Sequence, residues 1–193
     1  MKNTISRGFS KGVIIGIIAV LVILVAWGVA IYNGFVSSNE GVDNQWAQVE
    51  TQYQRRFDLI PNLVESVKGI MAQEQKVFGD LAEARTRYSG AQSVNDKAGA
   101  ATELEGALSR LLVIMENYPQ LRSVESVTAL MAELAGTENR VSVERKRFND
   151  MIQTYNLKVK TFPGKIFASL FGFNERNYFE TAAGTENVPA VNF

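Results

Sequence analysis

Cysteine and histidine are both absent from the 193-residue sequence. Without cysteine the chain has no disulfide, no thiolate nucleophile, no acylation site of the lipoprotein type and no cysteine-based zinc or iron–sulfur site. Without histidine it lacks the usual acid–base catalyst of neutral pH and the commonest transition-metal ligand. Catalysis by carboxylates and sites for Ca²⁺ or Mg²⁺ remain compatible with these absences.

An excess of positive charge is also absent. The chain carries 20 basic and 20 acidic residues, a formal net charge of zero, so no overall field attracts nucleic acid. Glycine-rich dinucleotide-binding and phosphate-loop patterns do not occur either. We therefore predict no enzymatic activity, no catalytic, cofactor-binding or metal-binding residue, no cofactor and no nucleic-acid partner.

A long uncharged run near the N-terminus predicts a membrane anchor. Residues 13–32 are twenty apolar or small residues in succession. As a helix they would span roughly 30 Å, about the hydrocarbon thickness of a bilayer. A buried core helix would need a larger protein around it, and residues 33–38 fit a signal-peptide cleavage site poorly. We predict a short basic tail over residues 1–12 and a transmembrane anchor over 13–34.

The charges flanking this run predict its orientation. Lys2, Arg7 and Lys11 precede it, whereas Glu40 and Asp43 are the first charged residues after it. By the positive-inside rule, the N-terminus of this single-pass protein lies in the cytoplasm and the rest of the chain lies outside the cytoplasm.

Beyond the anchor, apolar residues recur at spacings of three and four, a coiled-coil-like pattern typical of amphipathic helices. The first stripe predicts one helix over residues 41–88, continuous but kinked at Pro61, because proline removes a backbone donor inside a helix. A second stripe closes at Pro119, and a third alternates regularly from Val124 to Phe162. Residues 165–173 form a short apolar fourth element. The predicted fold is all-α: one N-terminal transmembrane helix followed by an antiparallel bundle of long kinked helices.

Several charged residues interrupt these apolar stripes or crowd the proline: Arg55, Arg56, Asp58, Glu74, Glu138 and Arg145. Unpaired charges on a buried seam are costly, so we expect these groups to pair across helices. We favour a structural role in fixing register over a metal or catalytic site, because carboxylate-bridged di-iron bundles need histidine as well. Apolar residues return at the C-terminus as Val188, Val191 and Phe193, which predicts a docking tail in cis or on a neighbour; a frayed end is the alternative.

Several multi-residue blocks resemble the bacterial LemA family. They occur in order along the chain: residues 46–50, 54–65, 138–140, 147–149, 155–156, 162–163, 172–173 and 189–193. Phe57 departs from the pattern, in which a smaller or polar residue is more usual. The resemblance implies a single anchor in the bacterial cytoplasmic (inner) membrane, a LemA-like helical bundle over residues 42–173, a C-terminal tail over 174–193 and no assigned enzymatic activity. Some family members are described with the N-terminus outside, so the opposite orientation stays open.

Two functions follow from these observations. The first is a non-enzymatic membrane-anchored scaffold or adaptor that self-associates and organises partners or the membrane, because the long stripe exceeds what the shorter second helix covers. Its expected partners are the lipid bilayer, further copies of the chain and, from the resemblance, another membrane protein such as a membrane protease. The alternative is an extracytoplasmic helical sensor that binds a small ligand between its helices and acts through a membrane partner.

Overall fold

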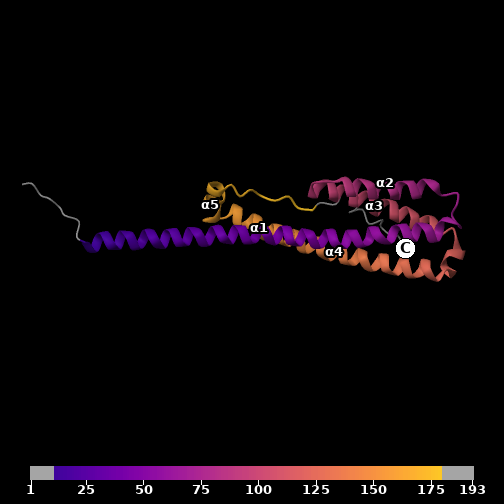
Figure 1. The fold of residues 1–193 in the computed structure, drawn as a ribbon, viewed down its shortest axis with the longest axis horizontal. Helices are drawn as coiled ribbons and strands as arrows, with labels where there is room; N and C mark the ends of the chain where they lie inside the picture. Colours follow the sequence, from indigo (N-terminus) through magenta and orange to yellow (C-terminus); the bar gives the residue numbers. More distant parts are fainter. Residues whose placement is uncertain (1–10, 180–193) are drawn as a thin grey trace, which may run out of the picture. The chain divides into compact units, whose positions relative to one another are not determined.

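A computed structural model describes residues 11–179, which fold into helices joined by short connections (Figure 1). The elements in chain order are α1 (Lys11–Lys68), α2 (Gln75–Gly90), α3 (Val94–Met115), the 3₁₀ helix η1 (Pro119–Ser123), α4 (Glu125–Lys160) and α5 (Gly164–Phe171). None of the described residues forms a β-strand. The predicted all-α class, with an apolar N-terminal helix and a helical bundle, is confirmed.

The chain divides into two compact units. Among the described residues, the first unit comprises 11–41 and 153–176, and the second comprises 42–152 and 177–179. Both α1 and α4 contribute to each unit.

The prediction of one unbroken helix over residues 41–88 is wrong, because α1 ends at Lys68 and α2 begins at Gln75. The amides of Ile70 and Met71 both donate to the carbonyl oxygen of Val67, at 3.0 and 2.9 Å, and close the last turn. Gly69 weakens the helix at this point. Pro61 lies inside α1 at an exposed position, and the kink there stays a prediction.

The apolar stripe hid this break because it continues across the connection. Val67 before the connection, Met71 within it, and Val77 and Leu81 after it are all buried. At the break the stripe takes two successive steps of three, from Met71 to Glu74 and from Glu74 to Val77. This irregularity is a weak sign, because two successive steps of four from Val49 to Phe57 lie inside the unbroken α1.

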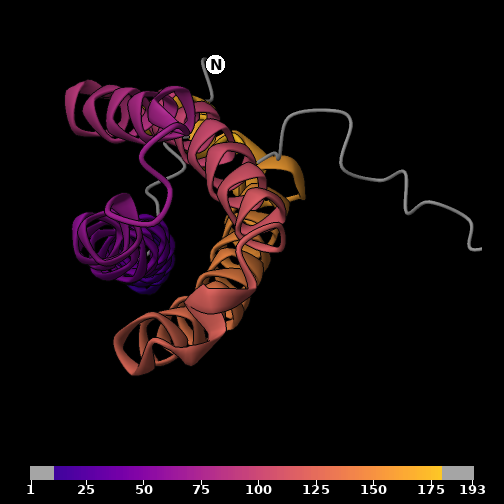
Figure 2. The same cartoon turned by 90° about the vertical axis from the view of Figure 1, so that its right-hand side faces the viewer.

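In the second unit, helices of alternating direction pack around one core. Helices α2 and α3 form a hairpin and lie side by side in both views (Figures 1 and 2). Ser93 starts α3 as its N-cap, where its hydroxyl oxygen accepts a hydrogen bond from the Asp96 amide at 3.0 Å. The fully buried side chains come from all four helices and η1, including Val49, Tyr53, Leu63, Leu81, Leu104, Leu111, Leu121 and Phe148. Burial of this apolar surface is the main force holding the unit together.

Burial along α4 agrees only in part with the predicted apolar stripe. Leu134, Val141 and Phe148 are buried as its spacing predicts, but Glu138 is exposed and Thr137 takes the buried position instead. A straight α-helix has 3.6 residues per turn, so a strict seven-residue repeat drifts around it by about 20° per heptad.

The first unit contains the apolar run. Within the described residues, α1 is the one helix long and apolar enough to cross a membrane, judged by length and composition. The side chains of its run, among them Ile15, Val22 and Val25, are largely exposed to the surroundings. Such a surface is unfavourable in water and favourable in hydrocarbon.

Candidate docking site for a non-helical segment

In the second unit, an asparagine side chain of α4 holds the backbone of residue 179. The Nδ2 group of Asn149 donates to the carbonyl oxygen of Phe179 at 3.1 Å. The amide of Phe179 donates to Oδ1 of Asn149 at 2.8 Å. One side-chain amide thus satisfies both polar backbone groups of a residue that belongs to no helix or strand.

The side chain of Phe179 is buried in a socket made by α1 and α4. Its ring centroid lies 6.0 Å from that of Trp46 and 6.4 Å from that of Tyr53. Phe148 extends the aromatic wall, with its centroid 5.2 Å from Trp46. The guanidinium carbon of Arg145 lies 4.3 Å from the Phe179 ring centroid, a cation–π contact. We call the residues that hold Phe179, namely Trp46, Tyr53, Arg145, Phe148 and Asn149, the docking site.

A polar network behind the socket holds Arg145 in place. Its Nη1 lies 3.5 Å from Oε1 of Glu105 on α3, and the Tyr53 hydroxyl donates to the same oxygen at 3.3 Å. Burial, followed by the negative charge of Glu105, raises the pKa of Tyr53 above its ordinary value of 10.0. The hydroxyl therefore keeps its proton and remains a donor, so that three helices fix the position of one cation.

The first unit contains a second asparagine clamp of the same kind. The buried side chain of Asn156 donates from Nδ2 to the carbonyl oxygen of Arg176 at 2.8 Å, and its Oδ1 accepts from the Arg176 amide, also at 2.8 Å. The guanidinium of Arg176 donates to Oδ1 of Asn39 at 3.1 Å. Asn149 and Asn156 therefore both bind backbone groups rather than a particular side chain.

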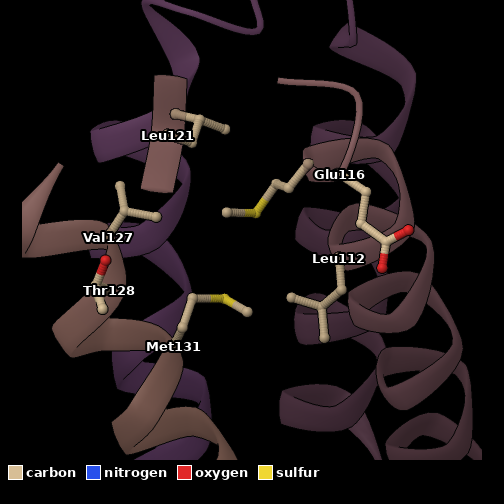
Figure 3. A pocket seen from close by; sticks show the side chains of 7 residues that line it. Leu112, Glu116, Leu121, Val127, Thr128 and Met131 are labelled. Carbon is tan, nitrogen blue, oxygen red and sulfur yellow. The ribbon is translucent and has the colours of Figure 1, made fainter. Parts of the chain in front are cut away.

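The second unit also contains an apolar cavity of about 590 Å³ between the end of α3, η1 and the start of α4. Figure 3 shows Leu112 on one side, facing Leu121, Val127 and Met131 on the other. Glu116 supplies a carboxylate at its edge. The volume is in the range of small-molecule sites.

The predicted polar residues of the seam occupy varied surroundings. Arg145 is the one that joins the docking site. Arg55 pairs with Glu133 at 3.0 Å with both side chains about half exposed, Asp58 accepts from Gln54 within α1 at 2.8 Å, and Glu74 accepts from the Tyr118 hydroxyl at 3.2 Å.

Arg56 is the most deeply buried of these residues. Its side chain is 5% exposed and its Nη2 lies 3.6 Å from Oε2 of Glu138, whose side chain is 69% exposed. Its Nε and Nη1 have no acceptor in the described part of the protein. The predicted docking residues Val188, Val191 and Phe193 lie outside the described residues.

Most of the chain is similar to known proteins. The sequence pattern of the LemA family matches residues 45–193. The chain belongs to the LemA family. Magnetosome protein MamQ 2 of Paramagnetospirillum magneticum is similar at 26% identity, over 77% of this chain and 64% of that protein. Magnetosome protein MamQ of Magnetospirillum gryphiswaldense is similar at 28% identity, over 79% of this chain and 66% of that protein.

The chain thus covers just under two thirds of the length of these relatives. LemA membership and the apolar run of α1 together indicate a single-pass, membrane-associated protein. In residues 11–179, no group of three or more acidic side chains is placed to hold a metal ion.

Sequence reasoning missed Asn149, Asn156, Glu105 and Phe179 as parts of a site. Both asparagines lie in blocks that resemble the LemA family, and each directly follows an aromatic stripe residue, Phe148 or Tyr155 in turn. The two asparagines are seven residues apart, so they occupy equivalent positions beside the buried stripe. This repetition is a signal from which a binding site could have been predicted. Glu105 and Phe179 carry no comparable local signal.

Proposed function

We propose that this LemA-family protein is a non-enzymatic, membrane-anchored scaffold, and that copies self-associate by exchanging their C-terminal segments at the docking site. The observation that carries this proposal is the seat of Phe179, which is held by Asn149 through its backbone and by an aromatic and cationic socket through its ring.

The docking site has the properties of a peptide-binding surface. A clamp on backbone groups accepts any residue in a suitable conformation, and a pocket for one side chain supplies selectivity. The occupant belongs to residues 177–179, which form no helix or strand and follow residues 153–176 of the first unit in the chain. Exchange of such a piece between identical chains replaces each contact by an equal one, so it costs little.

Segment exchange also replaces the reason for self-association that the sequence suggested. The stripe of α1 in the second unit, including Val49, Phe57 and Ile60, is buried within the same chain. An uncovered apolar stripe is therefore not what joins copies in this proposal. Another membrane protein, such as a membrane protease, remains an alternative occupant of the same site.

Crosslinking between differently tagged copies tests the proposal, because the chain has no native cysteine. One copy carries Tyr178→Cys beside the seated residue, and the other carries Lys146→Cys, one turn before Asn149; both positions are exposed. After co-expression in membranes, a short bismaleimide should join the two tags. A copy with Lys76→Cys on α2 in place of Lys146→Cys is the matched control and should give no such product.

The contrary result is equally clear. If a chain carrying both Tyr178→Cys and Lys146→Cys crosslinks within itself while the two tags never become joined, the segment stays in cis and segment exchange is wrong.

The apolar cavity favours a second candidate function, the binding of a small apolar ligand by a sensor. Its lining of Leu112, Leu121, Val127 and Met131 has only the carboxylate of Glu116 and the hydroxyl of Thr128 as polar groups. A reproducible rise in melting temperature with one class of amphipathic compound, lost in a cavity-filling Met131→Trp variant, would favour this function. No shift with any class would remove it.

A further inference from the structure

We propose that α5 is a second membrane-embedded element, seated against the anchor, whose outer face contacts the lipid of one bilayer leaflet. This inference goes beyond the scaffold function and does not depend on it. It rests on the aromatic contacts, the exposure and the charges of the first unit.

Aromatic contacts place α5 beside the last turns of the apolar run. The ring of Phe167 stands edge-on to Trp27 with centroids 5.6 Å apart, and the ring of Phe171 meets Tyr32 at 5.1 Å. A side-chain carbon at Gly28 would lie 3.7 Å from Cε1 of Phe167, an ordinary contact distance, so the ring lies close against α1 at this level. One face of α5 is therefore fixed to the anchor.

The level of these contacts along α1 sets the depth of α5. Trp27 and Gly28 precede the end of the run at Tyr32 by five and four residues, which is roughly 6–8 Å of helix. Residues 13–32 need hydrocarbon around them, so an element packed on residues 27–32 lies in the same layer. The rings of Trp27 and Tyr32 are also of the type that gathers at membrane interfaces.

The opposite face of α5 is apolar and uncovered. Ile166 is 60% exposed and Leu170, one turn later on the same face, is 72% exposed. Phe162, just before the helix, is 82% exposed. Lys165 and Ser169 form one polar edge of α5, and the other exposed side chains of the helix are apolar. Because this apolar face continues from the anchor, lipid is the occupant that satisfies it.

Polar residues mark where the chain leaves this layer. Lys158 at the end of α4 donates to the hydroxyl of Ser38, which lies beyond the apolar run of α1, and Lys160 pairs with Glu175 at 2.8 Å. Lys165 at the start of α5 is exposed, and its long stem can carry the ammonium group to lipid headgroups. Lys158 and Lys160 thus precede α5, Glu175 follows it, and Lys165 lies in its first turn beside the apolar face.

Turn geometry holds α5 in this position. A side-chain carbon at Gly164 would collide with the carbonyl oxygen of Lys158 and lie 3.4 Å from the Phe35 ring. At the other end, Gly172 has φ of +77°, a conformation that favours glycine, and the Phe173 amide donates to the Ala168 carbonyl at 2.9 Å. The ring of Phe173 then stacks on Phe35 with centroids 5.0 Å apart.

Spin labels on single cysteines of the full chain in proteoliposomes test the inference. Leu170→Cys and Ile166→Cys report on the outer face of α5, Val25→Cys on the anchor, and Val143→Cys on an exposed residue of α4 in the second unit. Collision with oxygen, which concentrates in lipid, is compared with collision with a nickel chelate, which stays in water. We expect the oxygen-to-nickel ratio at Leu170 and Ile166 to resemble that at Val25 and to exceed that at Val143 severalfold.

Two results would overturn the inference. Labels on α5 that collide with nickel as readily as the Val143 label would place this face in water. Labels shielded from both reagents, with dipolar broadening between chains, would show that a second copy covers it. Unchanged helix content by circular dichroism shows that each variant is folded, and the Val25 label separates failure of this inference from failure of the anchor itself.

Discussion

At the scale of single residues, Asn149 offers the most direct test of the docking site. Replacement by leucine keeps the approximate shape but removes both hydrogen bonds to the Phe179 backbone. We expect Asn149→Leu to lower the free energy of unfolding by about 1–3 kcal/mol, because a backbone donor and a backbone acceptor lose their partner. Chemical denaturation of the detergent-solubilised chain measures this loss.

Asn139→Leu is the matched control on the same helix. Its side chain is exposed, so the free energy of unfolding should change by less than about 0.5 kcal/mol. Equal effects at the two positions would mean that the Asn149 clamp contributes nothing to stability.

The buried hydroxyl of Tyr53 predicts a pH dependence of stability. In the unfolded chain a tyrosine loses its proton near the ordinary pKa of 10.0, whereas burial and Glu105 raise the folded pKa of Tyr53. Above about pH 10 the folded state therefore holds a proton that the unfolded state has released, and stability falls as pH rises. Below that pH the contribution is fully present.

Comparison with Tyr53→Phe isolates this effect from the titration of lysines, which both proteins share. The variant loses the hydrogen bond to Glu105 at every pH, but we expect its stability to fall less steeply from about pH 10 to about pH 11, by up to about 1.4 kcal/mol per pH unit. Urea unfolding at a series of pH values measures the two slopes. Parallel curves would show that Tyr53 titrates normally in the folded protein.

At the scale of elements, two glycines predict opposite responses to the same substitution. Gly164→Ala would push a methyl group into the Lys158 carbonyl at the start of α5, so we expect a loss of stability of about 1–3 kcal/mol. Gly79 lies inside α2 with nothing near its missing side chain, so Gly79→Ala should stabilise by about 0.5–1 kcal/mol. Thermal unfolding of both variants in the same detergent compares them; a stabilising Gly164→Ala would show that the turn has room to adjust.

The elements also show which parts of the fold the sequence could predict. Spacings of three and four identified the helices because each helix keeps one buried face. Val49 on α1, Leu111 on α3 and Val141 on α4 are examples of residues on these faces. The break after Lys68 was missed because Val67 and Val77 belong to the same core on either side of it. An apolar pattern records what is buried and carries no direct mark of where the backbone turns.

The docking site was less predictable for a related reason. Asn149 and Asn156 bind carbonyl and amide groups of residues 179 and 176, and backbone groups are the same at every position of a sequence. The pairing of Glu105 with Arg145 joins residues 40 positions apart, which no local pattern specifies. Of the polar residues of the docking site, only Arg145 was singled out beforehand, as a charge on the apolar seam.

At the scale of the whole molecule, one helix carries both the membrane run and part of the docking site. Residues 13–32, Trp46 and Tyr53 all belong to α1, which has no break between Lys11 and Lys68. The side of the membrane on which the proposed scaffold acts is therefore set by the direction in which α1 is inserted. The flanking charges, Lys2, Arg7 and Lys11 before the run and Glu40 and Asp43 after it, favour a cytoplasmic N-terminus.

Single cysteines labelled with a membrane-impermeant maleimide test this orientation in cells whose outer membrane has been permeabilised. We expect Val143→Cys on exposed α4 to be labelled in intact spheroplasts, and Ser6→Cys to be labelled only after lysis. The reverse pattern would place the docking site in the cytoplasm, where its partners would be cytoplasmic segments. It would also show that three basic residues before a single span do not decide the insertion of this chain, since the contribution of Asp and Glu after it is small.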